Sequence, residues 1–404
     1  MSWEPIVDDE LRKSALGTVQ AIAARLENHE MDDATISGGL AGVAVLFHYL
    51  DRAGLGDGYS AKRFLDRAMD AVAETPMSAS LYEGFLGIAW AIAHLSEKSG
   101  DDDLLYEVDS LLLELLRKPW YGDFDLTNGL VGIGVYARER FPSPAAEEML
   151  TLVIRQLDAV AEKGPHGTTW FTRPELLPPD TRSYYAPDGY YNLGMAHGAP
   201  GVIALLSHAF ALGVEKSKVR RLLDDAIPWL LARRIEDHGF GQFPRCIGPG
   251  IEPSPALAAW CHGDPGVAAA LLAAAKHVGE SNWADTAMAI CKPSVLLQDD
   301  ESRVAEAGFC HGAAGLAHLY NRFYQATGEE LFKEAACHWV RRTLDMRRRD
   351  QGIGGYLALT GSHGRMVWTP EPGMLIGSAG IALTLLAAST SIEPLWDRIY
   401  LLSK

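Results

Sequence analysis

Two cysteine-histidine pairs hold the side chains of this sequence best suited to bind a metal. They lie in "AAWCHGDPG" and "AGFCHGAAG", where Cys261 and Cys310 stand 49 positions apart. Neighbouring residues of a regular helix point about 100° apart, but at a turn into a helix both can converge on one point. Ligands from Cys261, Cys310 and His311 would leave the fourth position of a tetrahedral zinc ion open, as is typical of catalytic zinc.

The spacing of these pairs alone is weak evidence, because it matches no standard zinc-finger pattern. Free cysteine is among the most buried residue types, so a single cysteine-histidine dipeptide is more often an inert, packed pair. The metal interpretation is favoured because the pair occurs twice, at the same position of a repeat.

The repeat is a short segment, here called the glycine cassette, in which two glycines three positions apart precede an apolar run. Its first glycine occurs seven times, at positions 39, 84, 129, 198, 263, 312 and 377. Glycine permits a sharp turn into a helix and close approach of neighbouring helices, and the helix start presents free N–H groups. We therefore expect the cassettes to gather at one end of the fold, with the residues before each glycine pointing into a site.

The segments around the cassettes predict paired helices. Each cassette opens an apolar stretch with few charges, such as "GVAAALLAAAKHVG", which is typical of a helix buried on most sides. Amphipathic stretches such as "EELFKEAACHWVRRTLDMRRRD" precede the cassettes and indicate outer helices. We predict an all-α fold, an α/α toroid of seven inner and seven outer helices in a single domain spanning residues 1–404. An open solenoid of helix pairs is the alternative.

The long gap between the third and fourth cassettes is rich in proline, glycine and aromatic residues. Its sequence, at about 164–192, has poor helix propensity. We interpret it as a structured excursion beside the site, with short strands, or as a loop packed over the rim of the toroid.

Composition narrows the class of partner and the compartment. The chain has 404 residues, a formal net charge of −16 and a pI near 5.2, which argues against nucleic acid or an anionic membrane as the main partner. No apolar run reaches the roughly 18 to 20 residues needed to cross a bilayer, and "MSWEPIVDDELRK" lacks a signal-peptide pattern. Five cysteines are too sparse for a disulfide framework. We expect a cytoplasmic protein with reduced thiols.

The cassettes and their surroundings resemble the lanthionine synthetase C-like family, in particular its stand-alone class I lanthipeptide cyclases. The resemblance is carried by "NLGMAHGAPG", "AWCHGDPG", "FCHGAAGLAHLYNRFYQATG" and "LIGSAGIALTLL". It implies the α/α toroid and an intramolecular Michael-type addition of peptide cysteine thiols to dehydroalanine or dehydrobutyrine, which forms (methyl)lanthionine thioether rings. It also implies a dehydrated precursor peptide, with leader and core, as substrate. A separate dehydratase and a transporter are the implied partners, and a peripheral place at the membrane in a biosynthetic complex is the alternative to a free cytoplasmic protein.

The same resemblance implies roles for three further residues. His197, in "MAHGAPG", matches the acid/base histidine that would protonate the enolate formed by the addition. Asp125, in "GDFDLTNGLVG", matches an aspartate near the metal and would orient a histidine or assist proton transfer; without the match it would be taken as a helix N-cap. His262 stands where many bacterial members have tyrosine, and we expect a second acid/base group there, with ligation less favoured.

Two positions shortly before Cys261 can also be compared with the family. Trp260 matches a family aromatic beside the metal and would wall the site or pack in the core. Leu257 stands where several members have arginine, so a contact made there in relatives must be absent or come from another residue, for which Arg245 is a candidate.

Three other functions remain as alternatives. Eukaryotic relatives suggest addition of glutathione to dehydrated residues, and a non-catalytic peptide-binding scaffold could retain the metal. A glycosidase or terpenoid cyclase on an α/α toroid is less favoured, because the cassettes place thiols and imidazoles, not paired acids, at the expected mouth.

Overall fold

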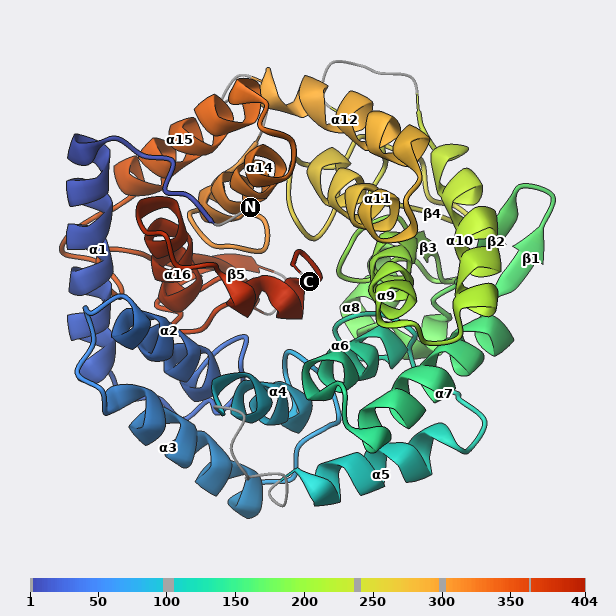
Figure 1. The fold of residues 1–404 in the computed structure, drawn as a ribbon, viewed down its shortest axis with the longest axis horizontal. Coiled ribbons are helices and arrows are strands. Elements are labelled where there is room, and N and C mark those ends of the chain that lie inside the picture. The colour runs from blue at the N-terminus through green and yellow to red at the C-terminus, as the bar shows by residue number, and fades with distance from the viewer. Residues whose placement is uncertain (1–2, 97–104, 236–240, 298–302, 363–364, 404) are drawn as a thin grey trace. The chain divides into compact units, whose positions relative to one another are not determined.

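The computed structural model describes residues 3–96, 105–235, 241–297, 303–362 and 365–403, and most of them are helical (Figure 1). They form two compact units. The first consists of Met1–Glu97 and Val304–Trp396, and the second of Lys98–Arg303 and Asp397–Lys404. The single domain expected for residues 1–404 stays a prediction.

The first unit contains four inner helices and three outer helices. The inner helices are α2 (Leu40–Arg52), α4 (Phe85–Leu95), α14 (Ala313–Thr327) and α16 (Ser378–Ser389). The outer helices are α1 (Asp9–Glu27), α3 (Ser60–Glu74) and α15 (Glu330–Asp345). Inner helices α14, α16, α2 and α4 are neighbours in this order, while α15 packs on α14, α1 on α16 and α3 on α2 (Figure 1). Since α1 packs on α16, helices from the two ends of the sequence share one core.

The second unit repeats this arrangement. Its inner helices are α6 (Leu130–Arg140), α9 (Ala199–Leu212) and α11 (Asp264–Val278), which contact one another in this order. Its outer helices are α5 (Tyr106–Leu116), α7 (Pro144–Val160), α10 (Lys216–Leu231) and α12 (Ser281–Val295). Helix α7 packs on α6, α10 on α9 and α12 on α11. The two units together confirm the predicted seven inner and seven outer helices within the described residues. A 3-10 helix, η3 (Leu395–Tyr400), follows near the end of the chain.

The glycine cassettes form one kind of turn. In each of the seven, the first glycine is the N-cap of the inner helix. A side chain on that glycine would collide with the carbonyl oxygen of the residue six positions earlier in the chain. In five cassettes this carbonyl accepts a hydrogen bond from the first helical N–H, as in Leu130 N to Asp123 O at 3.2 Å and Ala313 N to Glu306 O at 2.9 Å. Close approach of the loop therefore requires glycine, and the loop carbonyl satisfies one of the free N–H groups of the helix.

Neighbouring cassettes of the first unit are joined by backbone hydrogen bonds. All three bonds use the residue two positions before the N-cap. Cys310 N donates to Leu375 O at 2.7 Å, Leu375 N to Ser37 O at 3.2 Å, and Ser37 N to Tyr82 O at 3.2 Å. The four cassettes of this unit therefore gather at one end of its inner helices, as expected.

The cassettes of the second unit are joined in a similar way. Ala196 N donates to Cys261 O at 3.4 Å, which links the fourth and fifth cassettes. Leu126 N donates to Ala196 O at 3.2 Å, which links the third and fourth. In each unit, a cysteine of the candidate site therefore takes part in a backbone hydrogen bond between adjacent loops, Cys310 with Leu375 and Cys261 with Ala196.

The excursion before the fourth cassette contains the expected short strands. Strands β1 (Glu162–Gly164) and β2 (Gly167–Thr169) form an antiparallel hairpin, and β2 lies against α10. After η2 (Pro174–Leu176) and a short helix that was not expected, α8 (Pro179–Tyr184), strand β3 (Tyr191–Asn192) pairs with β4 (Cys246–Ile247). These segments share a small core, made of Leu177, Ala186, Tyr190 and Cys246.

A second hairpin was not predicted. Strands β5 (Ala358–Ser362) and β6 (Arg365–Thr369) pair antiparallel in the first unit. Met366 and Trp368 on β6 are 61% and 51% exposed, so this hairpin buries little of its apolar surface and lacks the usual buried-and-polar alternation of a strand. Among the described helices of the whole chain, none is long and apolar enough to span a membrane.

The cassette turn predicts different outcomes for two glycine substitutions. Gly39→Ala should lower the free energy of unfolding by about 1–3 kcal/mol, because the added methyl group meets the Asp33 carbonyl. Gly17→Ala, in the middle of α1 with no other group within 4 Å, should instead stabilise the protein by about 0.5–1 kcal/mol. Urea denaturation of both variants measures the difference. A Gly39→Ala protein as stable as the wild type would contradict the proposed crowding.

Candidate functional site

The candidate site residues occupy fixed positions in front of the inner helices. Three histidines directly precede an N-cap glycine, namely His197, His262 and His311. Cys261 and Cys310 stand one position earlier. Because the loop behind each glycine is held by backbone hydrogen bonds, these side chains leave from a rigid turn at the start of a helix.

In the second unit, the fold brings His197 and Asp125 together although they are 72 positions apart. His197 Nδ1 lies 2.5 Å from Asp125 Oδ2, and the other Asp125 oxygen accepts a hydrogen bond from Asn128 N at 2.7 Å. The Asp125 side chain is only 2% exposed, while that of His197 is 44% exposed. Asp125 thus accepts a hydrogen bond from its own loop and contacts the His197 ring, while the N-cap of the following helix is Gly129 and not Asp125. Its role in orienting a histidine stays a prediction.

Thr127 completes this contact and was missed in the sequence. Its hydroxyl donates to Asp125 Oδ2 at 2.9 Å and lies 3.1 Å from His197 Nδ1. The signal was available, because Thr127 stands two positions before the N-cap Gly129, where two other cassettes carry Cys261 and Cys310.

The charges around His197 favour its protonated form. Burial acts to lower the pKa of His197, but the Asp125 carboxylate, followed by Asp123 and Cys261, outweighs burial and raises this pKa above its usual value. The pKa of Asp123 is itself raised, first by burial and then by the negative charge of Asp125. A partly exposed imidazole next to a buried carboxylate is suited to hold a proton near neutral pH and to deliver it.

Cys261 and His262, also in the second unit, contact each other through their side chains. Cys261 Sγ lies 2.9 Å from His262 Nδ1, and both residues are partly buried. Trp260, by contrast, is fully buried, and its indole N–H donates to Tyr400 O at 3.1 Å. Trp260 thus packs in the core, the simpler of the two expectations.

In the first unit, His311 has an acidic partner that the sequence analysis missed. His311 Nε2 lies 2.9 Å from Glu306 Oε1, and the Glu306 side chain is 2% exposed. The other carboxylate oxygen, Oε2, accepts a hydrogen bond from Leu359 N on β5 at 2.7 Å. Glu306 stands six positions before the N-cap Gly312, in the loop that also holds Cys310.

Leu257, which stands where relatives have arginine, and Arg245 both make local contacts. The Leu257 backbone carbonyl fills the space that a side chain on Gly263 would need, and Gly263 has φ of +80°, in the region that favours glycine. The Arg245 guanidinium lies over the Tyr185 ring, 5.9 Å from its centroid.

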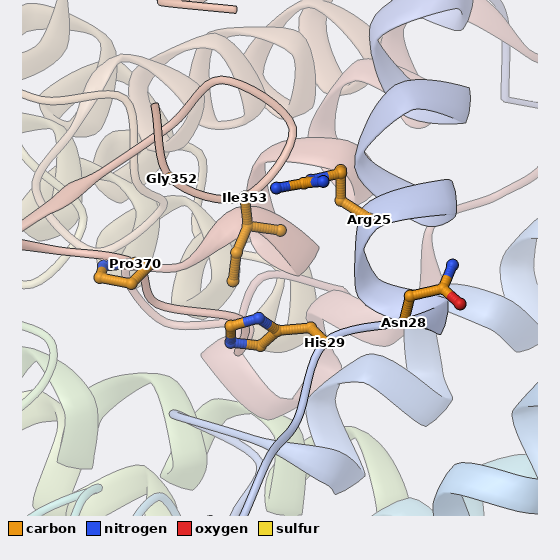
Figure 2. A pocket seen from close by; sticks show the side chains of 6 residues that line it. All are labelled: Arg25, Asn28, His29, Gly352, Ile353 and Pro370. Atoms are coloured by element: carbon orange, nitrogen blue, oxygen red, sulfur yellow. The ribbon is translucent and has the colours of Figure 1, made fainter. Parts of the chain in front are cut away.

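Two cavities occur in the first unit. One, of about 340 Å³, lies between the end of α1 and the segments flanking the β5–β6 hairpin, and Figure 2 shows its six lining residues, none of which was a candidate site residue. The other, of about 320 Å³, has Glu306 and Trp368 among its lining residues. Glu306 thus borders both a cavity and His311.

Three of the candidate residues offer metal-ligand atoms. Cys261, in the second unit, and Cys310 and His311, in the first, each contribute one, two sulfurs and one ring nitrogen in total. Neither cysteine is part of a disulfide. Thiolate and imidazole are ligand types that zinc prefers.

Comparison with known proteins assigns the class. Residues 30–401 match the family described as Lanthionine synthetase C-like protein. Because this match covers most of the sequence, the chain belongs to that family.

Individual relatives are distant in sequence, but they match most of this chain. Nisin biosynthesis protein NisC of Lactococcus lactis subsp. lactis is 22% identical over 334 residues, covering 76% of this chain and 77% of that protein. Glutathione S-transferase LANCL1 of Danio rerio is 23% identical over 335 residues, covering 77% and 75%. The solved structure of nisin cyclase matches with a TM-score of 0.76 at 19% identity, over 98% of both chains. The shared fold confirms the predicted fold class, the α/α toroid.

The contact between His197 and Asp125 predicts the effect of removing the carboxylate charge. In Asp125→Asn the pKa of His197 should fall, because burial remains while the largest favourable charge is lost. NMR titration of the His197 ring measures this pKa. Asp224→Asn, which removes an exposed partner of Arg220 in the same unit, is the control and should leave the pKa unchanged. An unaltered His197 pKa in Asp125→Asn would refute the coupling.

Proposed function

We propose that this protein is a zinc-dependent lanthipeptide cyclase. It adds cysteine thiols of a dehydrated precursor peptide to dehydroalanine or dehydrobutyrine in the same peptide and forms (methyl)lanthionine rings. The observation that carries the proposal is the His197–Asp125 pair, in which the loop of His197 is hydrogen-bonded to the loop of Cys261. Family membership and the nisin cyclase fold support the same reaction.

The proposed zinc ligands are Cys261, Cys310 and His311. When bound, zinc lowers the pKa of a coordinated substrate thiol from its usual value near 8.5, so that the thiol is ionised at neutral pH. Two thiolate ligands balance the charge of the dication, and one position remains for a substrate sulfur. In this proposal the three residues hold the metal and do not themselves react.

His197 is the proposed proton donor. The substrate sulfur forms a bond to the β-carbon of the dehydroamino acid, and the electron pair of the double bond moves towards the adjoining amide as an enolate. A proton from His197 then reaches the α-carbon, and the proton released by the substrate thiol restores the imidazolium. Asp125 and Thr127 keep Nδ1 engaged, which leaves Nε2 for the transfer.

His262 is proposed as a second acid/base group. Its Nδ1 lies against the Cys261 sulfur, so it can hold that side chain in place and exchange a proton with the site. The precursor peptide is the proposed substrate. A separate dehydratase that supplies the dehydrated peptide and a transporter that exports the product are the proposed partners.

Addition of free glutathione to dehydroamino acids is a second candidate function. It is favoured by the similarity to LANCL1, which is named as a glutathione S-transferase. Incubating the protein with glutathione and a dehydrated peptide that carries its own cysteines separates the two by mass spectrometry with thiol labelling. Rings without glutathione adducts support the cyclase, whereas adducts without rings refute it.

Substitution of a ligand predicts loss of metal and activity together. Cys310→Ala should abolish both bound zinc and ring formation, since one of the proposed thiolate ligands is removed. Cys337→Ala, in α15 of the same unit, with its thiol near Ile6 O, is the matched control and should retain both. Zinc is measured by mass spectrometry of the purified protein. Unchanged cyclisation by Cys310→Ala would refute a catalytic metal, and zinc-loaded wild-type protein without cyclisation would favour a peptide-binding scaffold.

Substitution of the proton donor predicts loss of activity with the metal retained. His197→Asn should lower kcat for ring formation by about 10²–10⁴-fold, the usual contribution of a general acid, without lowering zinc content. His166→Asn, in the exposed turn between β1 and β2, serves as the control and should be fully active. A His197→Asn enzyme within a few-fold of the wild type would show that the proton comes from elsewhere.

A further inference from the structure

Glu306 is a buried acid that none of the proposed catalytic steps uses. Its carboxylate is 2% exposed, and Oε1 lies 2.9 Å from His311 Nε2. The contact with His311 is an ion-pair distance without hydrogen-bond geometry, so Oε1 has no hydrogen-bond partner among the described residues, while Oε2 accepts from Leu359 N. A buried carboxylate oxygen left unpaired is costly, and a rotation of the imidazole would bring its Nε2–H onto Oε1 from the observed distance of 2.9 Å.

The equivalent residues of other cassettes behave differently. Four of them, each six positions before an N-cap glycine, carry a carboxylate or amide side chain, namely Asp33, Asp123, Asn192 and Glu371. Their side-chain oxygens accept hydrogen bonds from their own loop or from a residue just before it, such as Thr35 N for Asp33 and Thr369 Oγ1 for Glu371. Glu306 instead reaches the residue that directly precedes the N-cap, which here is His311.

We propose that Glu306 is a positioning residue that binds His311 through Nε2 and thereby turns Nδ1 towards the metal. The inference rests on the proposed zinc site. Histidine ligands commonly donate their second N–H to a carboxylate, which fixes the tautomer and ring orientation and makes the ligating nitrogen more basic. Leu359 on β5 anchors the other oxygen, so the β5–β6 hairpin holds the acid in place.

The test compares zinc affinity in the wild type and in Glu306→Gln. Leu359 N and His311 Nε2 face different oxygens of Glu306, and glutamine replaces one of these oxygens by an NH₂ group that can only donate. The Kd for zinc, measured by competition with a chromophoric chelator, should rise by about 10–100-fold. Circular dichroism and thermal unfolding establish that the variant is folded.

Glu371→Gln is the matched control. Glu371 occupies the same loop position in the same unit, but its cassette carries Leu375 and Ile376 where ligands stand in the sixth. Its zinc affinity should equal that of the wild type. Equal zinc affinity in Glu306→Gln and the wild type would overturn the role of Glu306. An equal loss in both variants would also overturn it, because the effect would then be a general disturbance of the unit.

NMR of the zinc-loaded wild type tests the inference without a variant. With ¹⁵N-labelled histidine, His311 should show a protonated Nε2 and a metal-bound Nδ1, and the opposite assignment would refute the role of Glu306. A wild-type protein that binds no zinc would refute the proposed metal site together with this inference. Zinc binding with an unchanged Glu306→Gln protein would refute only the inference.

Discussion

The turn in front of each inner helix is the constraint on which the rest of the structure depends. The loop carbonyl six positions before the N-cap approaches the helix start so closely that only glycine fits there, and in five cassettes it accepts the first helical N–H. The residues between this carbonyl and the glycine are therefore held in one backbone conformation. Side chains one and two positions before the glycine leave from a fixed point, which is what a metal ligand or a proton donor requires.

Hydrogen bonds between adjacent loops fix how the side chains of neighbouring turns lie against one another. Within the second unit, the third and fourth cassettes are joined at Leu126 and Ala196, and this contact sets His197 against Asp125. Burial of the imidazole acts to lower the pKa of His197, but the negative charge of the Asp125 carboxylate raises this pKa above its usual value. The electrostatics of the site thus follow from backbone geometry.

The structure pairs a buried carboxylate with the imidazole before an N-cap twice, and the two cases differ in the nitrogen that is held. Asp125 Oδ2 contacts Nδ1 of His197. Glu306 Oε1 lies against Nε2 of His311. Because the two ring nitrogens are distinct, this difference is what the proposed function needs, with histidine as an acid in one cassette and as a ligand in another.

The sequence by itself determined the paired helices, the positions of the turns and the residues presented there, because glycine spacing and apolar runs are local signals. It also named His197, Asp125, Cys261, Cys310 and His311 as candidates. Only the tertiary structure decided that Thr127 bridges Asp125 and His197, that Glu306 holds His311, and that β5 and β6 pair beside it. These contacts depend on which loops become neighbours and on how far a side chain reaches between them. Such distances arise from packing, and no periodicity along the chain records them.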